Sequence, residues 1–163
     1  MQIKYLGKDN FEIKDKKATV YTGESTRVND VELAGPGEYE IASIFIDGLN
    51  DGIYIFNLEE VTVAHLGQLS RTLTDSEVDK INGVDILMVP VGKDKALSPK
   101  LAIEVINQID PKIVIPMDLG ALDEFCKMEG VSLPKEAVFK IAKNDLPQEE
   151  ERKVIALCPQ TKS

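Results

Sequence analysis

A nearly continuous apolar run at residues 84–91 is the feature that most constrains how this chain can fold. A strand that is apolar along its whole length is typical of a sheet covered on both faces. Ser98 and Pro99 then mark the start of a helix, because serine is a good N-cap and proline is tolerated in the first turn. A second apolar strand follows at residues 112–117. Strand, helix and strand in this order predict a parallel βαβ crossover.

The first half of the chain has a different pattern, in which short β-prone runs are separated by polar turns. These runs predict strands at residues 3–6, 11–14, 18–22, 31–33, 39–46, 53–58 and 61–65. The last three are longer and joined by short turns, which predicts an antiparallel meander of those three strands.

Two further helices and two closing strands complete the expected secondary structure. Thr74 and Glu77 have the spacing of a capping box, which predicts a helix that ends near Ile81. The remaining elements are a helix at residues 119–128 and strands at residues 137–142 and 154–158. The sequence therefore predicts one α/β (α+β) domain over residues 1–163.

The charge of the chain excludes several classes of partner. With 19 basic and 28 acidic residues, the net charge is −9. Such a chain repels phosphate backbones and anionic lipid surfaces, so we expect neither a nucleic-acid partner nor a membrane partner. The sequence starts in a strand-like run without the features of a signal peptide, and we expect a cytoplasmic protein. Cys126 and Cys158 are expected to be reduced thiols.

Four segments together resemble the small zinc-dependent hydrolases of the metallo-β-lactamase superfamily. They are the opening residues 3–7 (IKYLG), residues 35–41 (GPGEYEI), 64–69 (AHLGQL) and 111–118 (PKIVIPMD). The resemblance covers about residues 1–130. It implies an αββα sandwich of mixed sheets with flanking helices, whose zinc ions lie at one edge of the two sheets.

The same resemblance implies that the metal-binding residues are missing. The segment with the family's His-x-His-x-Asp-His cluster is expected between residues 22 and 35, where the chain is too short to hold it. The bridging aspartate of the family corresponds to Gln68, and a ligand histidine corresponds to Asp118. The last ligand histidine has no counterpart at residues 48–52. A catalytic zinc needs about three protein ligands, so we expect no bound metal and no other cofactor.

His65 is the single histidine of the chain and the obvious remnant candidate. It is expected at a strand end with hydrogen bonds to the backbone, but it can also be read as an acid–base group or as a metal ligand beside Asp118. A second alternative is an oxygen-only site for a hard cation, formed by Asp118 with Asp47, Asp51 or Asp85.

These interpretations lead to three hypotheses about function. The first is a pseudoenzyme with a binding or assembly role, in which loss of the segment exposes a sheet edge and apolar surface, and a homodimer or higher assembly covers them. The second is a residual or repurposed metal-dependent hydrolase that uses His65, Asp118 and water. The third is a regulatory subunit that pairs with an intact member of the family.

Overall fold

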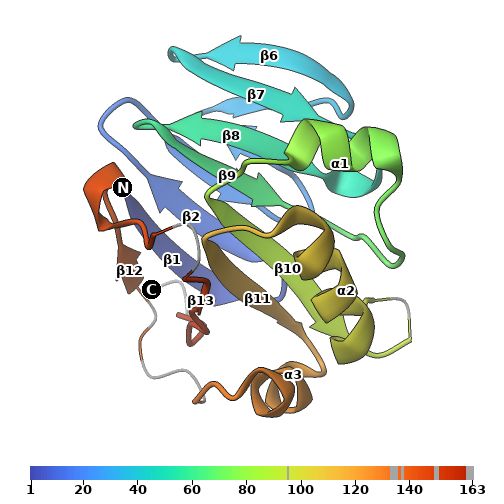
Figure 1. Cartoon of the computed structure of the whole chain (residues 1–163). Coiled ribbons are helices and arrows are strands. Elements are labelled where there is room, and N and C mark those ends of the chain that lie inside the picture. Colours follow the sequence, from blue (N-terminus) through green and yellow to red (C-terminus); the bar gives the residue numbers. More distant parts are fainter. Residues whose placement is uncertain (95, 133–135, 137, 149–150, 161–163) are drawn as a thin grey trace.

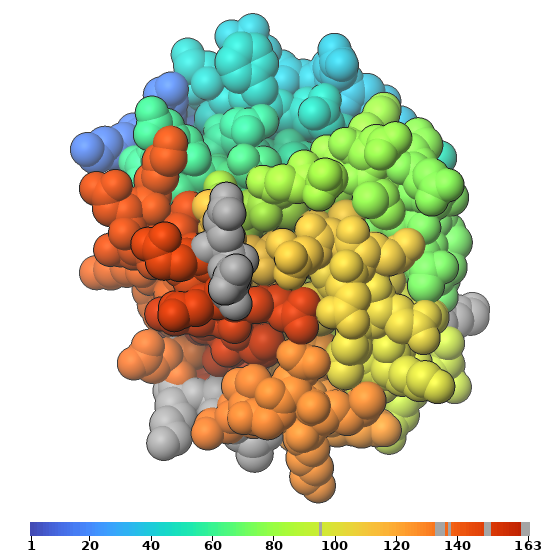
Figure 2. All heavy atoms as spheres, viewed as in Figure 1, coloured from blue at the N-terminus to red at the C-terminus, as the bar shows by residue number. Residues whose placement is uncertain are grey.

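The structure is a computed structural model that describes residues 1–94, 96–132, 136, 138–148 and 151–160. Two β-sheets pack face to face, and helices cover the outer side of one of them (Figure 1). Figure 2 shows the helical side of the molecule as a filled surface. Two sheets with flanking helices confirm the predicted fold class.

The six-stranded sheet is antiparallel throughout, in the order β12-β1-β2-β3-β4-β5. Alternate residues of β1 to β3 are buried, as expected for a sheet with one solvated face. The outward-facing side chains are mostly polar, as expected for a face that contacts water. The strands are β1 Gln2–Gly7, β2 Asn10–Lys14, β3 Thr19–Thr22, β4 Arg27–Val28, β5 Val31–Glu32 and β12 Val138–Lys140.

The seven-stranded sheet is mixed, in the order β13-β11-β10-β9-β8-β7-β6. Its first four strands in the chain form the predicted antiparallel meander, and β9, β10, β11 and β13 are parallel. The strands are β6 Gly37–Ile41, β7 Ile44–Gly48, β8 Tyr54–Leu58, β9 Val61–His65, β10 Ile86–Gly92, β11 Ile113–Leu119 and β13 Lys153–Val154. A short 3-10 turn, η1 Asn50–Gly52, lies between β7 and β8.

Three helices follow the sequence signals closely. Helix α1, Asp75–Ile81, has the predicted capping box, with reciprocal bonds between Thr74 and Glu77. Helix α2, Pro99–Ile109, starts after the Ser98 cap and forms the predicted crossover between β10 and β11. Helix α3, Leu122–Glu129, packs with α2 over the parallel strands. Within the described residues, no helix is long and apolar enough to cross a bilayer.

Two apolar cores hold these layers together. One fills the space between the two sheets, with Phe11, Phe56 and Ile115 among its fully buried members. The other lies between the seven-stranded sheet and the helices, with Val105 and Phe125 at its centre. Because β10 has residues in both cores, all seven of its residues are buried, which explains the apolar run in the sequence.

The structure corrects some of the expected boundaries. Residues 39–46 were expected to be one strand, but they form a hairpin of β6 and β7 with its turn at Ala42 and Ser43. Strand β11 continues to Leu119, so α3 begins three residues later than expected. The closing strands β12 and β13 are shorter than expected, and Ala137 lies outside the described residues. Between Thr22 and Gly35 the chain forms the short β4–β5 hairpin, in which β4 was not expected.

Candidate functional site

The candidate site lies where the parallel strands β9, β10 and β11 end. Ligands of sheets with parallel strands commonly bind beyond the carboxyl ends of those strands. His65 is the last residue of β9, and Asp118 lies near the end of β11. The turn between β1 and β2, with Lys8 and Asp9 at its tip, reaches the same place from the other sheet. The site is therefore built from both sheets.

His65 is buried and held by backbone atoms at both ring nitrogens. Its side chain faces the core between the sheets, where the edge of the Phe11 ring contacts it at a centroid distance of 5.9 Å. The amide of Gly67 donates to Nδ1 at 3.1 Å, so Nδ1 has no proton. Nε2 therefore has the proton and donates to the carbonyl oxygen of Asp9 at 2.9 Å. Burial lowers the pKa of His65, which favours this neutral ring.

Tyr5 connects the same turn to the end of β11. Its hydroxyl donates to the carbonyl oxygen of Lys8 at 2.7 Å and accepts from the amide of Asp118 at 2.9 Å. The ring is almost fully buried, and burial raises the pKa of Tyr5 to about 12. The turn between β1 and β2 is thus joined to β9 through His65 and to β11 through Tyr5.

The side chain of Asp118 is exposed and has a local partner. Its Oδ1 accepts from the amide of Gly120 at 3.0 Å, which is the turn chemistry common for aspartate after a strand. Asp118 lines a hollow of about 290 Å³ together with Lys93 and the first turn of α3. Asp123 and Glu124 lie in that turn, so the hollow has charges of both signs.

Gln68 lines a second hollow of about 290 Å³, on the other side of the strand ends. Its side chain is exposed, and its backbone amide donates to the carbonyl oxygen of Asp51 at 2.9 Å. The preceding residue, Gly67, has φ +52°, and a Cβ there would lie 2.4 Å from the carbonyl oxygen of Gly52. The start of the loop after β9 is therefore pressed against η1. The hollow is lined by Lys8, Asp9, Gln68, Leu69, Ala96 and Leu119.

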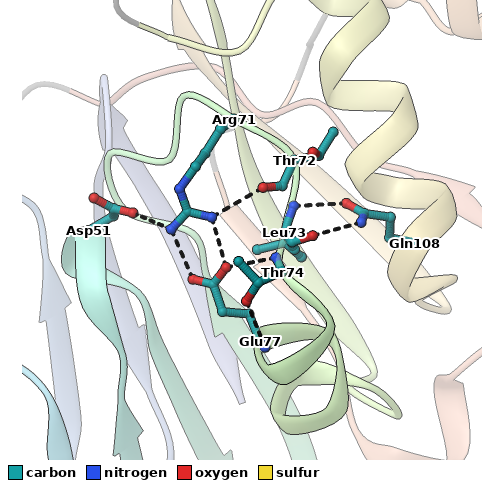
Figure 3. Close-up of polar contacts among 7 residues, drawn as sticks. All are labelled: Asp51, Arg71, Thr72, Leu73, Thr74, Glu77 and Gln108. Atoms are coloured by element: carbon teal, nitrogen blue, oxygen red, sulfur yellow. Dashed lines mark hydrogen bonds and ion pairs between the residues drawn. The ribbon is translucent and has the colours of Figure 1, made fainter.

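A network of ion pairs and hydrogen bonds fixes the rest of that loop (Figure 3). Arg71 bonds both oxygens of Glu77, at 2.8 and 3.1 Å, and Oδ2 of Asp51 at 2.7 Å. The hydrogen bond from Arg71 holds the pKa of Glu77 down at about 2. The side-chain amide of Gln108, on α2, forms two hydrogen bonds with the backbone of Leu73. The loop that contains Gln68 is thus anchored to η1, α1 and α2.

The other aspartates considered as cation ligands are not brought together. Asp85 precedes β10 at the opposite end of the parallel strands, where it accepts from the amide of Thr62 at 2.9 Å. Asp118 lies beside Val91 at the carboxyl end of β10, a separation of about 20 Å at the usual rise per residue. Asp51 is paired with Arg71. Asp85 is therefore too far from Asp118 to share a cation with it.

The donor groups at the site do not fit a catalytic zinc ion. Among the described residues, no group of three or more His, Cys, Asp or Glu side chains is placed to hold a metal. The nitrogens of His65 are both engaged with backbone groups, and a neutral amide at Gln68 supplies no charge to offset the desolvation of the cation. The exposed carboxylate of Asp118 lies near those of Asp123 and Glu124, with no imidazole nitrogen beside them that is free to bind a metal.

A comparison with protein families assigns residues 2–118 to the β-lactamase superfamily domain. The chain belongs to this superfamily. The match covers most of the chain and includes His65, Gln68 and Asp118, and it confirms the resemblance found in the sequence motifs.

Curated relatives are described as UPF0173 metal-dependent hydrolases. The protein from Staphylothermus marinus is 28% identical over 88 residues, which are 50% of this chain and 39% of the relative. The protein from Bacillus mycoides is 30% identical over 78 residues, which are 48% of this chain and 34% of the relative. The match to this chain thus spans little more than a third of the length of either relative.

A solved structure from Thermotoga maritima has the same architecture over its whole length. That protein is described as a candidate zinc-dependent hydrolase of the metallo-β-lactamase superfamily. The two chains are 25% identical with a TM-score of 0.83, and the match covers 96% of this chain and 98% of the Thermotoga chain. The compact two-sheet form is therefore shared by a second protein of nearly equal length.

Two functional contacts were not found from the sequence. Asp9 and Tyr5 organise the site, although Tyr5 was noted only as part of the opening motif. Asp9 is 56 residues from His65, and Tyr5 is 113 residues from Asp118. Nothing in the local sequence of the turn at residues 7–10 indicates that a carbonyl group there accepts a hydrogen bond from a histidine.

Proposed function

We propose that this chain is a metal-independent member of the superfamily and acts as a binding or assembly module. One observation carries this proposal: both nitrogens of the single histidine are bonded to the backbone of the protein itself. A zinc ion at Nε2 has to displace the Asp9 carbonyl oxygen, and one at Nδ1 has to displace the Gly67 amide. Either change leaves a buried backbone group without its partner, which costs about 1–3 kcal/mol.

The chemistry lost with the metal is the activation of water. A zinc ion lowers the pKa of bound water from about 15.7 to about 7 and so supplies a hydroxide nucleophile. No side chain at the described site replaces that function. His65 is buried with its proton on Nε2 committed to Asp9, and Asp118 is exposed to bulk water. These features support a role in binding over a role in hydrolysis.

Metal content tests this proposal directly. Tag-free protein, produced with added zinc and passed through a desalting column, is analysed for metals by mass spectrometry. We expect no stoichiometric zinc in the wild type and the same result for Asp118→Asn. Stoichiometric zinc in the wild type, lost in Asp118→Asn, would overturn the proposal, because that pair of results requires a metal site at the end of β11.

A metal-dependent hydrolase is the second candidate. It is favoured by the descriptions of the relatives and by the exposed Asp118 beside Lys93 in an open hollow. This candidate predicts hydrolysis of chromogenic carboxylic or phosphate esters that EDTA abolishes and zinc restores. Activity that persists in both Asp118→Asn and His65→Gln comes from a contaminant and counts against it.

We further propose that the chain assembles with partners, either as a homodimer or with an intact member of the family. One edge of the six-stranded sheet ends in the exposed strand β5, where Val31 is 49% exposed. Light scattering at micromolar concentration tests self-association, and a clean monomer contradicts the homodimer. Co-purification from the native cell tests the intact relative. We propose a cytoplasmic location, in which buried Cys126 stays reduced.

A further inference from the structure

The helices leave one part of the seven-stranded sheet uncovered. Helix α2 packs on β10, and α3 packs on β10 and β11. In Figure 1, β6 lies at the top of the sheet with no helix in front of it. Strand β6 is also the last strand of the sheet, so one side of its backbone has no neighbouring strand in the part of the chain that the structure describes. An edge of this kind is a template for another strand.

The uncovered face is acidic around one exposed aromatic ring. Tyr39 and Ile41 of β6 pack against the core between the sheets, so Glu38 and Glu40 point to the opposite, helix-side face. Phe45 of β7 lies directly across from Glu40 and is 60% exposed. Asp47 lies across from Glu38 on the same face. We call Glu38, Glu40, Phe45 and Asp47 the β6 acidic face.

This edge is held in a fixed shape from below. The hydroxyl of Tyr39 donates to the carbonyl oxygen of Gly35 at 2.7 Å, and the hydroxyl of Tyr54 accepts from the amide of Gly35 at 3.0 Å. Gly48, which pairs with Gly37, lies very close to Gly35. A Cβ added at Gly48 would lie 2.5 Å from the carbonyl oxygen of Gly35. A fixed edge strand loses little conformational entropy when a partner strand adds to it.

A second copy of this chain is a poor occupant of the edge. Symmetric antiparallel pairing of two β6 strands about Tyr39 places Glu38 of each copy opposite Glu40 of the other. Like charges directly opposite each other on a sheet destabilise the pair. Both glutamates are exposed and have no ion-pair partner within the described residues. The complementary occupant has positive charges at these two positions.

We propose that β6 binds an extended segment of a different protein by strand addition, with Lys or Arg side chains opposite Glu38 and Glu40. Backbone hydrogen bonds to the free edge supply affinity, and the two charge pairs select the partner. The alkyl stem of a long basic side chain also covers the exposed ring of Phe45. This inference concerns an edge strand three places from β9 in the sheet and uses neither His65 nor Asp118, so it stands or falls independently of metal content.

A charge-reversed copy of the chain is a suitable probe. The variant Glu38→Lys/Glu40→Lys presents a basic strand of known conformation, and antiparallel pairing places each lysine opposite a wild-type glutamate. Isotope-labelled wild type is titrated with the unlabelled variant and followed by amide NMR at low salt. A matched control, Glu104→Lys/Glu124→Lys, has the same change in net charge on exposed positions of α2 and α3.

We expect saturable shifts of the amide signals of residues 37–41 with the β6 variant, several-fold weaker binding at high salt, and no such shifts with the control. Circular dichroism of each variant checks that it is folded. Absence of shifts with the folded β6 variant, or equal shifts with the control, would overturn the proposal. The proposal would also be overturned if the wild type formed dimers and the β6 variant on its own did not. That result would show that two acidic β6 strands pair with each other.

Discussion

The Nε2 atom of His65 lies 2.9 Å from the carbonyl oxygen of Asp9, which joins the end of β9 to the turn between β1 and β2. The ring is buried between the two sheets, and its other nitrogen accepts from Gly67. Together with Tyr5, this contact ties the two sheets at the carboxyl ends of β9 and β11. Hydrogen bonds between two buried side chains and backbone groups thus provide the cross-link at this edge.

The neutral state of His65 makes the stability of the fold depend on pH. Burial lowers the pKa of the folded-state ring below the ordinary 6.5. As the pH falls, His65 is therefore protonated in the unfolded chain before it is protonated in the folded chain. The contribution of the neutral ring to the free energy of unfolding is complete above pH 6.5 and is lost as the pH falls towards the lowered pKa. We expect the free energy of unfolding to fall by up to about 1.4 kcal/mol per pH unit in that window. Urea unfolding of the wild type and His65→Gln across pH 5–8 measures it; an equal slope in both contradicts the assignment.

Removing the Tyr5 hydroxyl is expected to destabilise the fold without creating a large cavity. In Tyr5→Phe the Asp118 amide and the Lys8 carbonyl group lose a partner, which costs about 1–2 kcal/mol. The raised pKa also predicts that wild-type stability declines as the pH rises from 10 towards about 12. Tyr21→Phe is the control, because the Tyr21 ring contacts Arg27 through its face. Equal thermal midpoints for the two variants would count against the role of Tyr5.

The close contact at Gly67 predicts an unusually large effect of adding one methyl group. In Gly67→Ala the new Cβ meets the Gly52 carbonyl group, and the backbone has to shift. Gly83 has a positive φ as well, +88°, but nothing lies within 4 Å of a Cβ placed there. Both variants suffer the backbone strain of about 1 kcal/mol, and only Gly67→Ala suffers the clash in addition. Chemical unfolding that ranks Gly83→Ala as the less stable variant would refute this comparison.

Arg71 is expected to stabilise the loop after β9 by a modest amount. Its side chain is 44% exposed, so solvent screening limits the loss in Arg71→Met to about 1 kcal/mol. In the variant, the pKa of Glu77 should rise from about 2 towards 4.5. In the wild type, the contribution of the Arg71–Glu77 pair to the free energy of unfolding is complete above pH 4.5 and declines as the pH falls towards 2. This part of the pH dependence should be absent in Arg71→Met. NMR titration of the Glu77 carboxyl group tests this; an unchanged titration in the variant contradicts it.

Local signals predicted the helices and the parallel strands well. The capping box at Thr74 and Glu77 and the Ser98 cap involve residues within one turn of each other, so the sequence contains all of the information. The hairpin at Ala42 and Ser43 was missed for the opposite reason. Both residues have positive φ, yet neither is the glycine or asparagine that usually marks such a turn.

The site was only partly predictable. Sequence motifs pointed to His65, Gln68 and Asp118, which lie at the end of β9, in the loop after it and near the end of β11, with β10 between the two strands. They gave no information on Asp9 or Tyr5, whose contacts depend on how the two sheets are placed against each other. The orientation of a buried polar group is set by such long-range packing, and a single sequence contains no local pattern for it.

The protonation of His65 tests the central claim most directly, because the chain has a single histidine and its ring signals need no assignment. Long-range proton–nitrogen correlation NMR of tag-free protein at pH 7 distinguishes the two neutral tautomers from each other and from a metal-bound ring. We predict a neutral ring with its proton on Nε2, and a spectrum unchanged by one equivalent of zinc. A shift of either ring nitrogen that saturates at one zinc per chain would contradict it.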